Sequence, residues 1–556
     1  MSTIDTIPLH DVVVIGAGFA GIYLVHKLRD ELGLDVKVFE RGAGIGGTWY
    51  WNRYPGARCD LESDTYSLSF NDEIEQEWNW SERYASQPEI LRYINFVADK
   101  LDVRGNIELN TTVTRAVFDE HAEMWTVSTD TGASVRARFL VSATGILSVP
   151  SMPQFAGMDD FKGEIYHTGD WPHEGVDFAG KRVAVIGTGS SGIQSIPVIA
   201  EEAKTVTVFQ RTATFTVPAA NRPVTENERM ATKRSYKQLR VQLRRSHIGA
   251  LLEPPIGRFG EVDIRLVRGE LERRWRGTGM SATMVLSDNL TSIEANNYTS
   301  QFVRDKIHEI VDDPATARML EPHDYPIGTK RLALDTNYYD TFNRDNVTLV
   351  SVRQTPIEHF SPAGIVVDGN EHEFDAIVLA TGFDASTGAL DRIHIEGIDG
   401  QTLKDAWAEG AKSYLGLATP GFPNFFTVTV TGPGSPAILT NVIGSIEHHV
   451  EWIADYLAYM RDEGITRTEA TTQAQDQWVS HVAELAAMTL YPKAASWYMG
   501  ANVPGKPRVF LAYIGGLHNY RDRCEQIAAD GYLGFTHASG AGAQDASDRN
   551  TRLTAI

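Results

Sequence analysis

Two stretches of the chain share one pattern of apolar and polar positions. "DVVVIGAGFAGIYLV", from Asp11, and "RVAVIGTGSSGIQ", from Arg182, each begin with β-branched residues, pass through three glycines and continue into a helix-forming segment. A short β-branched run bounded by glycine predicts a strand, and the apolar periodicity after the glycines predicts a helix. The sequence therefore predicts the same strand–turn–helix unit twice.

The glycine spacing of both units is G-x-G-x-x-G, which suits the binding of a dinucleotide. The first glycine makes a tight turn, the second lets the backbone approach a pyrophosphate, and the third lets the helix pack on its strand. The helix N-terminus then faces the negative charge. The residues predicted to line these two cradles are Gly16, Gly18, Phe19, Ala20 and Gly21 in the first, and Gly187, Thr188, Gly189, Ser190, Ser191, Gly192 and Gln194 in the second.

The residue at the end of the next strand distinguishes the two cradles. Glu40 ends "DVKVFE", 24 residues after Gly16, and Arg211 follows "TVTVFQ", 24 residues after Gly187. A carboxylate there accepts hydrogen bonds from ribose hydroxyls and repels a 2′-phosphate, whereas a guanidinium suits that phosphate. The second cradle is therefore predicted to bind NADPH. The first is predicted to bind a dinucleotide with a free ribose, for which FAD is the natural candidate in a protein with two such units.

The order of the remaining patterns predicts how the two units are connected. Strand-like runs end in Ala-Thr-Gly at "FLVSATG" and again at "AIVLATG", and helical periodicity fills the region between Asn221 and Pro326. We expect an α/β fold with two Rossmann-like domains, the NADP domain inserted in the FAD domain and itself carrying a helical insertion. The predicted parts are 1–145 and 388–540 (FAD domain), 153–220 and 327–380 (NADP domain), 221–326 (insertion) and 541–556 (a disordered tail).

Composition and charge narrow the classes of partner. The net charge of −21 disfavours nucleic acid, and no apolar run approaches the length of a membrane span. The N-terminus lacks the features of a secretion signal, and two cysteines cannot form a disulfide framework, so a cytoplasmic location is expected. The stretch 229–245 has seven basic residues and no acidic one, which favours a solvated helix face over an anionic binding surface.

Two further motifs carry a resemblance to a known family. "FKGEIYHTGDWP" (161–172) fits the fingerprint F-x-G-x-x-x-H-x-x-x-W-P of the type I Baeyer–Villiger monooxygenases, and "GGTWYWNRYPGARCD" (46–60) resembles their second signature. The similarity extends over roughly 10–535. "AILTN" after "TGPGSP" resembles the phenylacetone and steroid monooxygenase branch most closely.

The resemblance implies an enzyme that uses FAD, NADPH and O2 to convert a ketone into an ester or lactone. In such enzymes NADPH reduces the flavin, O2 adds to it, and the resulting peroxyanion attacks the ketone carbonyl. Arg331 matches the active-site arginine and Asp60 the aspartate that holds it. His167 and Trp171 would couple domain motion to cofactor handling. The other implied cofactor contacts are Gly47, Thr48, Trp49, Tyr50, Trp51, Asp60, Tyr66 and Val113 for FAD, and Thr212, Lys330 and Trp497 for NADPH.

Other classes of protein share part of this sequence pattern. A flavin monooxygenase that oxidises nitrogen or sulfur shares both cradles and stays open as the nearest alternative. A disulfide reductase needs a C-x-x-C and a serine hydrolase a G-x-S-x-G, and the chain has neither. A metal site at His448 and His449 is disfavoured, because adjacent helical residues point in different directions. An FAD- and NADPH-binding sensor without turnover would not need Asp60 and Arg331.

Overall fold

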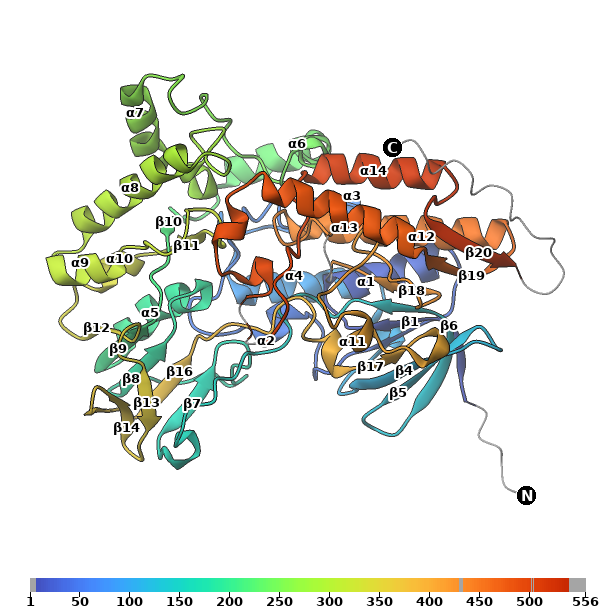
Figure 1. Ribbon diagram of the computed structural model, residues 1–556, viewed down its shortest axis with the longest axis horizontal. Helices are drawn as coiled ribbons and strands as arrows, with labels where there is room; N and C mark the ends of the chain where they lie inside the picture. Colours follow the sequence, from blue (N-terminus) through green and yellow to red (C-terminus); the bar gives the residue numbers. More distant parts are fainter. Residues whose placement is uncertain (1–6, 430–433, 502, 504, 540–556) are drawn as a thin grey trace.

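Two sheets with parallel strands organise the chain. The computed structural model describes residues 7–429, 434–501, 503 and 505–539 of the 556. The predicted tail at 541–556 and the start of the Gly-Pro-Gly-Ser-Pro segment lie outside the described residues. In Figure 1 the first sheet lies on the right and the second on the left, and helices cover both.

The first sheet has eight strands in the order β17-β4-β5-β6-β1-β2-β3, with β18 also paired to β6. Its strands are β1 (Leu9–Ile15), β2 (Val36–Phe39), β3 (Ile107–Glu108), β4 (Val113–Asp119), β5 (Met124–Thr129), β6 (Ser134–Ser142), β17 (His394–Glu396) and β18 (Phe425–Thr427). β1 pairs in parallel with both β2 and β6. Val12, Val13 and Val14 of β1 are fully buried, as expected of a β-branched strand covered on both faces.

The second sheet has five strands, all parallel, in the order β12-β9-β8-β16-β7. The strands are β7 (Glu164–His167), β8 (Arg182–Ile186), β9 (Thr205–Gln210), β12 (Val347–Ser351) and β16 (Ala376–Leu379). Val183 and Val185 pack into one hydrophobic cluster while Ala184 and Ile186 pack into another, so both faces of β8 are buried. All five strands lie between β6 and β17 in the sequence.

This topology confirms the predicted α/β fold class. The chain leaves the first sheet after β6 and returns to it with β17 and β18, so the second unit is inserted in the first. The two chain passages between the sheets run together, since the Ser151 N–H donates to Gly382 O (2.9 Å) and the Asp384 N–H donates to Val149 O (2.9 Å). The exact domain boundaries stay a prediction.

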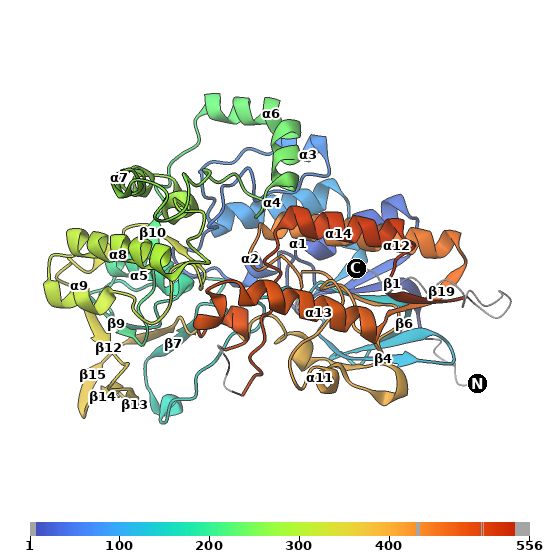
Figure 2. The same cartoon turned by 45° about the horizontal axis from the view of Figure 1, so that its top comes forward.

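A cluster of helices interrupts the second unit. These are α6 (Glu226–Arg245), α7 (Ile264–Trp275), α8 (Ile293–Ile310) and α9 (Pro314–Leu320), and they lie between β10 (Thr216–Pro218) and β11 (Ala333–Asp335). Thr225 begins α6 with a capping box, in which its side chain and that of Glu228 bond each other's backbone N–H groups. Phe215, Leu271 and Phe302 belong to a hydrophobic cluster inside this region. Figure 2 shows α6 extending from it over the first unit.

The first unit also contains helices from both ends of the sequence. They are α1 (Phe19–Val25), α2 (Thr48–Trp51), α3 (Asp72–Glu77), α4 (Gln87–Lys100), α12 (Val442–Asp462), α13 (Thr472–Ala487) and α14 (Leu517–Ala529). The remaining α-helices and strands are α5 (Ser190–Glu202), α10 (Tyr338–Thr341), α11 (Leu403–Ala406), β13 (Ile357–Phe360), β14 (Gly364–Val367), β15 (Asn370–Glu373), β19 (Ile465–Ala470) and β20 (Phe535–Ser539). Within the described residues, no helix is both long and apolar enough to cross a bilayer.

Candidate active site

The two glycine turns have the same backbone geometry. Gly16 has φ +105° and Gly187 has φ +111°, a region that side chains rarely adopt. A Cβ on either glycine would collide with a backbone carbonyl, that of Ala143 for Gly16 and that of Ala380 for Gly187. These alanines belong to the two Ala-Thr-Gly strand ends, so each turn closes against the neighbouring parallel strand in the same way.

The third glycine of each turn lets the helix approach its strand. A Cβ on Gly21 would collide with the carbonyl of Gly16, and one on Gly192 with that of Gly187. Gly18 and Gly189 are the N-caps of α1 and α5 and offer no side-chain cap. The first N–H groups of both helices are therefore left to bind an anion. Phe19 and Ala20 lie in the first turn of α1, and Ser190 and Ser191 in that of α5.

The strand ends beside the two turns differ in burial as well as in charge. Glu40 is buried, and its carboxylate accepts the N–H groups of Ala17 (2.8 Å) and Gly42 (2.7 Å). Arg211 is exposed, and no hydrogen bond or ion pair joins its guanidinium to another residue of the described chain. The first strand end is thus fixed by backbone donors, while the second presents a free cation.

A second cation lies near Arg211. The ammonium group of Lys330 lies 4.4 Å from the centre of the Tyr325 ring. Burial lowers the pKa of Lys330, and the positive charge of Arg211 lowers it further, whereas Asp324 opposes the shift. Thr212, the next predicted contact, accepts the Thr188 hydroxyl at its carbonyl oxygen (2.9 Å). The structure therefore gathers Arg211, Thr212 and Lys330 beside the second turn.

Gln194 of α5 joins the second cradle to the segment that leaves the first. Its side chain accepts the Tyr54 hydroxyl (2.8 Å) and donates to Arg58 O (3.1 Å). The backbone comes so close that a Cβ on Gly56 would collide with the Gln194 carbonyl. The sequence motif at 46–60 contained Tyr54 and Gly56, but its pattern gave no sign that they contact the second cradle.

Aromatic residues gather beside the first cradle. The Trp49 indole donates to the Tyr66 hydroxyl (3.0 Å), and the Tyr66 ring meets Phe19 edge to face with centroids 6.0 Å apart. The Arg41 guanidinium lies 4.3 Å from the centre of the Trp51 ring. The other predicted contacts of this cradle lie close by. Gly47 (φ +53°) precedes α2 and packs on Gly18, and Thr48 and Tyr50 lie in α2. Val113 is buried, and two residues before it the Thr111 N–H donates to Glu40 O (2.9 Å).

Asp60 and Arg331 form a bidentate ion pair where the two units meet. The Arg331 Nε and Nη2 donate to the two Asp60 carboxylate oxygens at 2.7 and 2.6 Å, and each side chain is 24 % exposed. Burial alone would disfavour the charged guanidinium, but Asp60 outweighs it and raises the pKa of Arg331 above its usual value. Asp60 therefore holds a permanently charged guanidinium in a fixed position.

Tyr498 is a neighbour of this ion pair that the sequence motifs did not single out. It lies in the short helix η8 (Trp497–Met499) with its ring 4.7 Å from that of Trp497, the predicted nicotinamide contact. Burial raises the pKa of Tyr498 to about 12, and the Arg331 charge opposes the rise. Tyr498 thus remains a neutral phenol beside Arg331 at ordinary pH, and its position next to Trp497 was the only available signal.

The two fingerprint residues differ in their surroundings: His167 lies where the chain passes between the two units, and Trp171 lies inside the second unit. His167, at the end of β7, shares a hydrogen bond with the Thr381 hydroxyl (3.2 Å) and accepts the Gly169 N–H at Nδ1 (2.9 Å). Nε2 is therefore the protonated nitrogen, and burial lowers the pKa of this imidazole. Thr381 also donates to Ser151 O (2.8 Å). Trp171 is buried in the core of the second unit.

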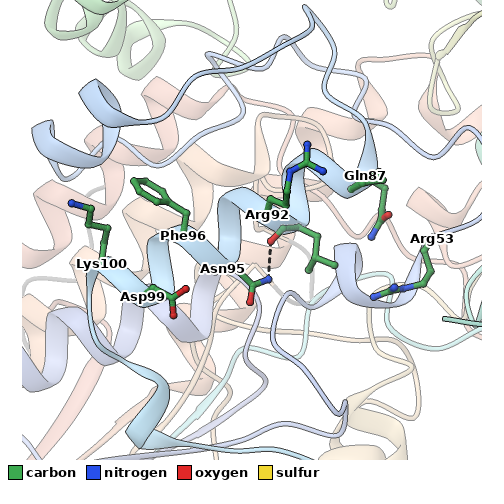
Figure 3. Close-up of a pocket in the computed structure, with 9 residues that line it drawn as sticks. Arg53, Gln87, Arg92, Asn95, Phe96, Asp99 and Lys100 are labelled. Atoms are coloured by element: carbon green, nitrogen blue, oxygen red, sulfur yellow. Dashed lines mark hydrogen bonds between the residues drawn. The ribbon is translucent and has the colours of Figure 1, made fainter. Parts of the chain in front are cut away.

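A separate cavity of about 860 Å³ lies along α4. Figure 3 shows Arg92, Asn95, Phe96, Asp99 and Lys100 along this helix, with Gln87 and Arg53 at its other end. Gln87 donates to Trp49 O (2.5 Å), which places the cavity beside the first cradle. None of the predicted site residues lines it.

His448 and His449 are buried in α12 and face different neighbours. His449 accepts the Thr429 N–H at Nδ1 (3.0 Å) and shares a hydrogen bond with the Tyr520 hydroxyl at Nε2 (2.9 Å). Burial lowers the pKa of both histidines, to about 3 for His449. Within the described ranges, no group of three or more His, Cys, Asp or Glu side chains is arranged to hold a metal ion.

Comparison with known proteins gives several relatives over nearly the whole chain. The pyridine nucleotide-disulphide oxidoreductase family matches residues 13–245. A Baeyer-Villiger monooxygenase of Pseudooceanicola batsensis is 44% identical over 94% of this chain and 95% of its own. Phenazine N-monooxygenase PhzNO1 of Lysobacter antibioticus is 42% identical over 94% of this chain and 96% of its own.

Solved structures of similar proteins also match nearly the whole chain. Steroid monooxygenase bound to NADP matches 96% of this chain and 100% of its own with 49% identity and a TM-score of 0.91. OTEMO in complex with FAD and NADP matches the same shares of the two chains with 41% identity and a TM-score of 0.92. With such identity over nearly the full length, the chain belongs to the Baeyer–Villiger monooxygenase family.

Proposed function

We propose that the chain binds FAD in the first cradle and NADPH in the second and inserts one oxygen atom of O2 next to a ketone carbonyl. Overall, ketone, O2, NADPH and a proton give ester or lactone, NADP⁺ and water. The relative solved with FAD and NADP and the two equivalent turns support the cofactors. Buried Glu40 supports a free ribose in the first cradle, and Arg211 with Lys330 supports a 2′-phosphate in the second.

The single observation that carries this function is the Asp60–Arg331 pair. When bound, the flavin supplies the hydride acceptor and the centre that activates O2. The chain supplies a guanidinium that cannot lose its proton and stabilises negative charge as it develops on the substrate oxygens. Asp60 holds the guanidinium by two hydrogen bonds, so no reorganisation is needed during reaction. Gln194, Tyr54 and Gly56 keep the segment that carries Asp60 against the NADPH unit.

One observation favours a second candidate function, the oxidation of an aromatic nitrogen. A relative that is 42% identical over 94% of this chain is named a phenazine N-monooxygenase. Membership of the family therefore does not by itself select a ketone. The ketone remains the first proposal because the fixed cation of Arg331 suits the anionic adduct of a carbonyl addition. Steroid monooxygenase, at 49% identity, points toward a bulky ketone.

We place the enzyme in the cytoplasm, which suits the free thiols of Cys59 and Cys524.

Product analysis tests the proposal. The FAD-loaded protein is given NADPH, air and a panel of linear, cyclic, aryl and steroid ketones, with a thioether and a phenazine in separate reactions. Mass spectrometry that detects esters or lactones one oxygen heavier than the ketones supports the proposal and ranks the substrates. An N-oxide or sulfoxide as the sole product, with every ketone untouched, would replace it with the second candidate.

A further inference from the structure

The segment that carries Asp60 and Tyr66 is buried although it has no regular secondary structure. We name residues 60–70 the strap; all are described, and they form neither helix nor strand. Leu61, Ser63, Thr65, Ser67 and Leu68 are each at most 6 % exposed. Buried backbone groups need partners, and in the strap these come from local turns, from the neighbouring loop and from side chains: the Ser63 N–H donates to Arg83 O (2.8 Å) and the Tyr66 N–H to Glu62 O (2.9 Å). The position of the strap therefore depends on the residues that bond to it.

After residue 64, four side chains from three helices bond to backbone groups or hydroxyl groups of the strap. Asn441, the N-cap of α12, donates to Thr65 O (2.6 Å), and the Tyr93 hydroxyl of α4 accepts the Leu68 N–H (3.0 Å). Glu447 of α12 accepts both the N–H and the hydroxyl of Ser69. The fourth is Arg240 of α6, whose Nη2 donates to the Ser67 hydroxyl (2.8 Å).

Arg240 comes from the helical insertion, for which no role was predicted from the sequence. It is 8 % exposed, and its Nε donates to Glu75 of α3 (2.6 Å), the helix that follows the strap. This pair is buried, with the Arg240 and Glu75 side chains 10 % and 4 % exposed. Burial raises the pKa of Glu75, and Arg240 counteracts that rise. Because Nε is held by Glu75, the planar guanidinium has a fixed orientation in which Nη2 donates to Ser67.

Ser67 is next to Tyr66, the residue that accepts the Trp49 indole beside the first cradle. A displacement at Ser67 is therefore passed directly to Tyr66, and through the same strap to Asp60. We propose that Arg240 is a positioning residue for the active site: through Ser67 it fixes the strap, and thereby Tyr66 and Asp60, against the cofactor side of the first unit. This inference rests on the proposed roles of Tyr66 and Asp60.

The structure offers a matched control one helical turn away. Lys237 of α6 pairs with Asp72 of α3 at 3.0 Å, three residues before each member of the buried pair. Those side chains are 85 % and 69 % exposed, and Lys237 does not contact the strap. The two pairs join the same two helices with the same charges. They differ in burial and in the bond to Ser67.

The experiment compares Arg240→Met/Glu75→Gln with Lys237→Met/Asp72→Asn, each measured beside wild type. Removing both charges of the buried pair avoids leaving an unpaired charge in the core. Ser67→Ala deletes the bond to Arg240 without touching the ion pair, together with the bond that the Ser67 hydroxyl donates to Asp64 O (3.1 Å) within the strap. Hydrogen exchange of peptides covering 60–70, with and without cofactors, measures the strap directly. The visible spectrum of bound flavin and the ester formed per NADPH consumed report on the site.

We expect Arg240→Met/Glu75→Gln to speed exchange in the strap, shift the flavin spectrum and lower ester per NADPH by at least about threefold, because small misplacements cost large factors in rate. Ser67→Ala should change strap exchange, the flavin spectrum and ester per NADPH in the same direction but by a smaller amount. Lys237→Met/Asp72→Asn should change none of these three. Unchanged exchange and coupling in the first variant, or equal losses in the exposed-pair control, overturn the inference. If the first variant does not fold, Arg240→Lys decides by the same criteria, because an ammonium keeps the charge beside Glu75 and lacks the fork that also reaches Ser67. If wild type makes no ester, the proposed function fails while strap exchange still tests Arg240.

Discussion

The two cradles share a backbone and differ in the residue at the strand end. Both first glycines have φ near +105 to +111° and pack on the alanine of an Ala-Thr-Gly strand end. Beside this common turn, Glu40 is buried and bonded to two backbone N–H groups, while Arg211 is exposed and free of partners among the described residues. We infer that the turn binds the pyrophosphate common to all dinucleotides, and that the residue at the strand end selects between them.

The largest expected effect is at Arg331, where segments from both cradles meet. Arg331→Ala should still bind FAD and NADPH and transfer hydride from NADPH to the flavin. The ester formed per NADPH consumed should fall by about 100-fold or more, because the loss of one preorganised donor at a developing negative charge costs about that much. The missing electrons should appear as hydrogen peroxide. Arg331→Lys should fall between, because an ammonium lacks the fork that Asp60 holds. Normal ester yield in Arg331→Ala would contradict the role.

Replacing the third glycine of either cradle by alanine should impair only the cofactor of that cradle. In Gly192→Ala the added Cβ collides with the Gly187 carbonyl. NADPH-dependent activity should therefore fall by about 50-fold, which corresponds to the usual free-energy cost of overpacking, while FAD remains bound. Gly21→Ala should instead yield protein that lacks FAD. Cofactor content by absorbance and steady-state kinetics checks both variants. Loss of FAD from Gly192→Ala with retention in Gly21→Ala would reverse the assignment.

Arg211→Ala tests the selectivity of the second cradle alone. Loss of a charge-assisted hydrogen bond to the 2′-phosphate should lower kcat/KM for NADPH by about tenfold or more and leave that for NADH unchanged. NADH serves as the internal control because it shares every group except this phosphate. Equal losses for both nucleotides would show that Arg211 supports the fold rather than reading the phosphate.

The smallest effect is a pH dependence from Lys330. Its pKa is lowered by burial, so the ammonium loses its proton at a lower pH than an ordinary lysine. The charge favours NADPH below that pKa and is lost as the pH rises through it. KM for NADPH should therefore increase about threefold in the alkaline range. The effect is small because a partly solvated ionic contact contributes little binding energy. Lys330→Arg should flatten this profile, and a profile unaffected by it would assign the titration elsewhere.

Local patterns were enough to predict the cradles. A strand, three glycines and a helix lie close together in sequence, so the elements around Gly16 and Gly187 could be inferred from spacing. The Asp60–Arg331 pair, which joins residues 271 apart, was implied only by the family resemblance. The seven basic residues at 229–245 favoured a solvated face, which holds for Lys237 and is wrong for Arg240.

The rest could not be predicted because it depends on packing between distant segments. Arg240 and Glu75 are 165 residues apart, and Tyr54 and Gln194 are 140 apart. No periodicity or spacing encodes such contacts. Their partners are fixed only once the insertion has folded over the first unit, where burial turns an ordinary arginine into a rigid donor.

Isotope labelling of the product tests the central claim most directly. Wild-type enzyme with FAD, NADPH and an accepted ketone is supplied with isotopically heavy O2, and then with heavy water under ordinary air. If both cradles serve one oxygen-inserting site, the ester gains a single heavy oxygen from the gas and none from the water, with one NADPH consumed per ester. An ester without label from the gas, or NADPH consumed with hydrogen peroxide as the only oxygen product, would contradict it.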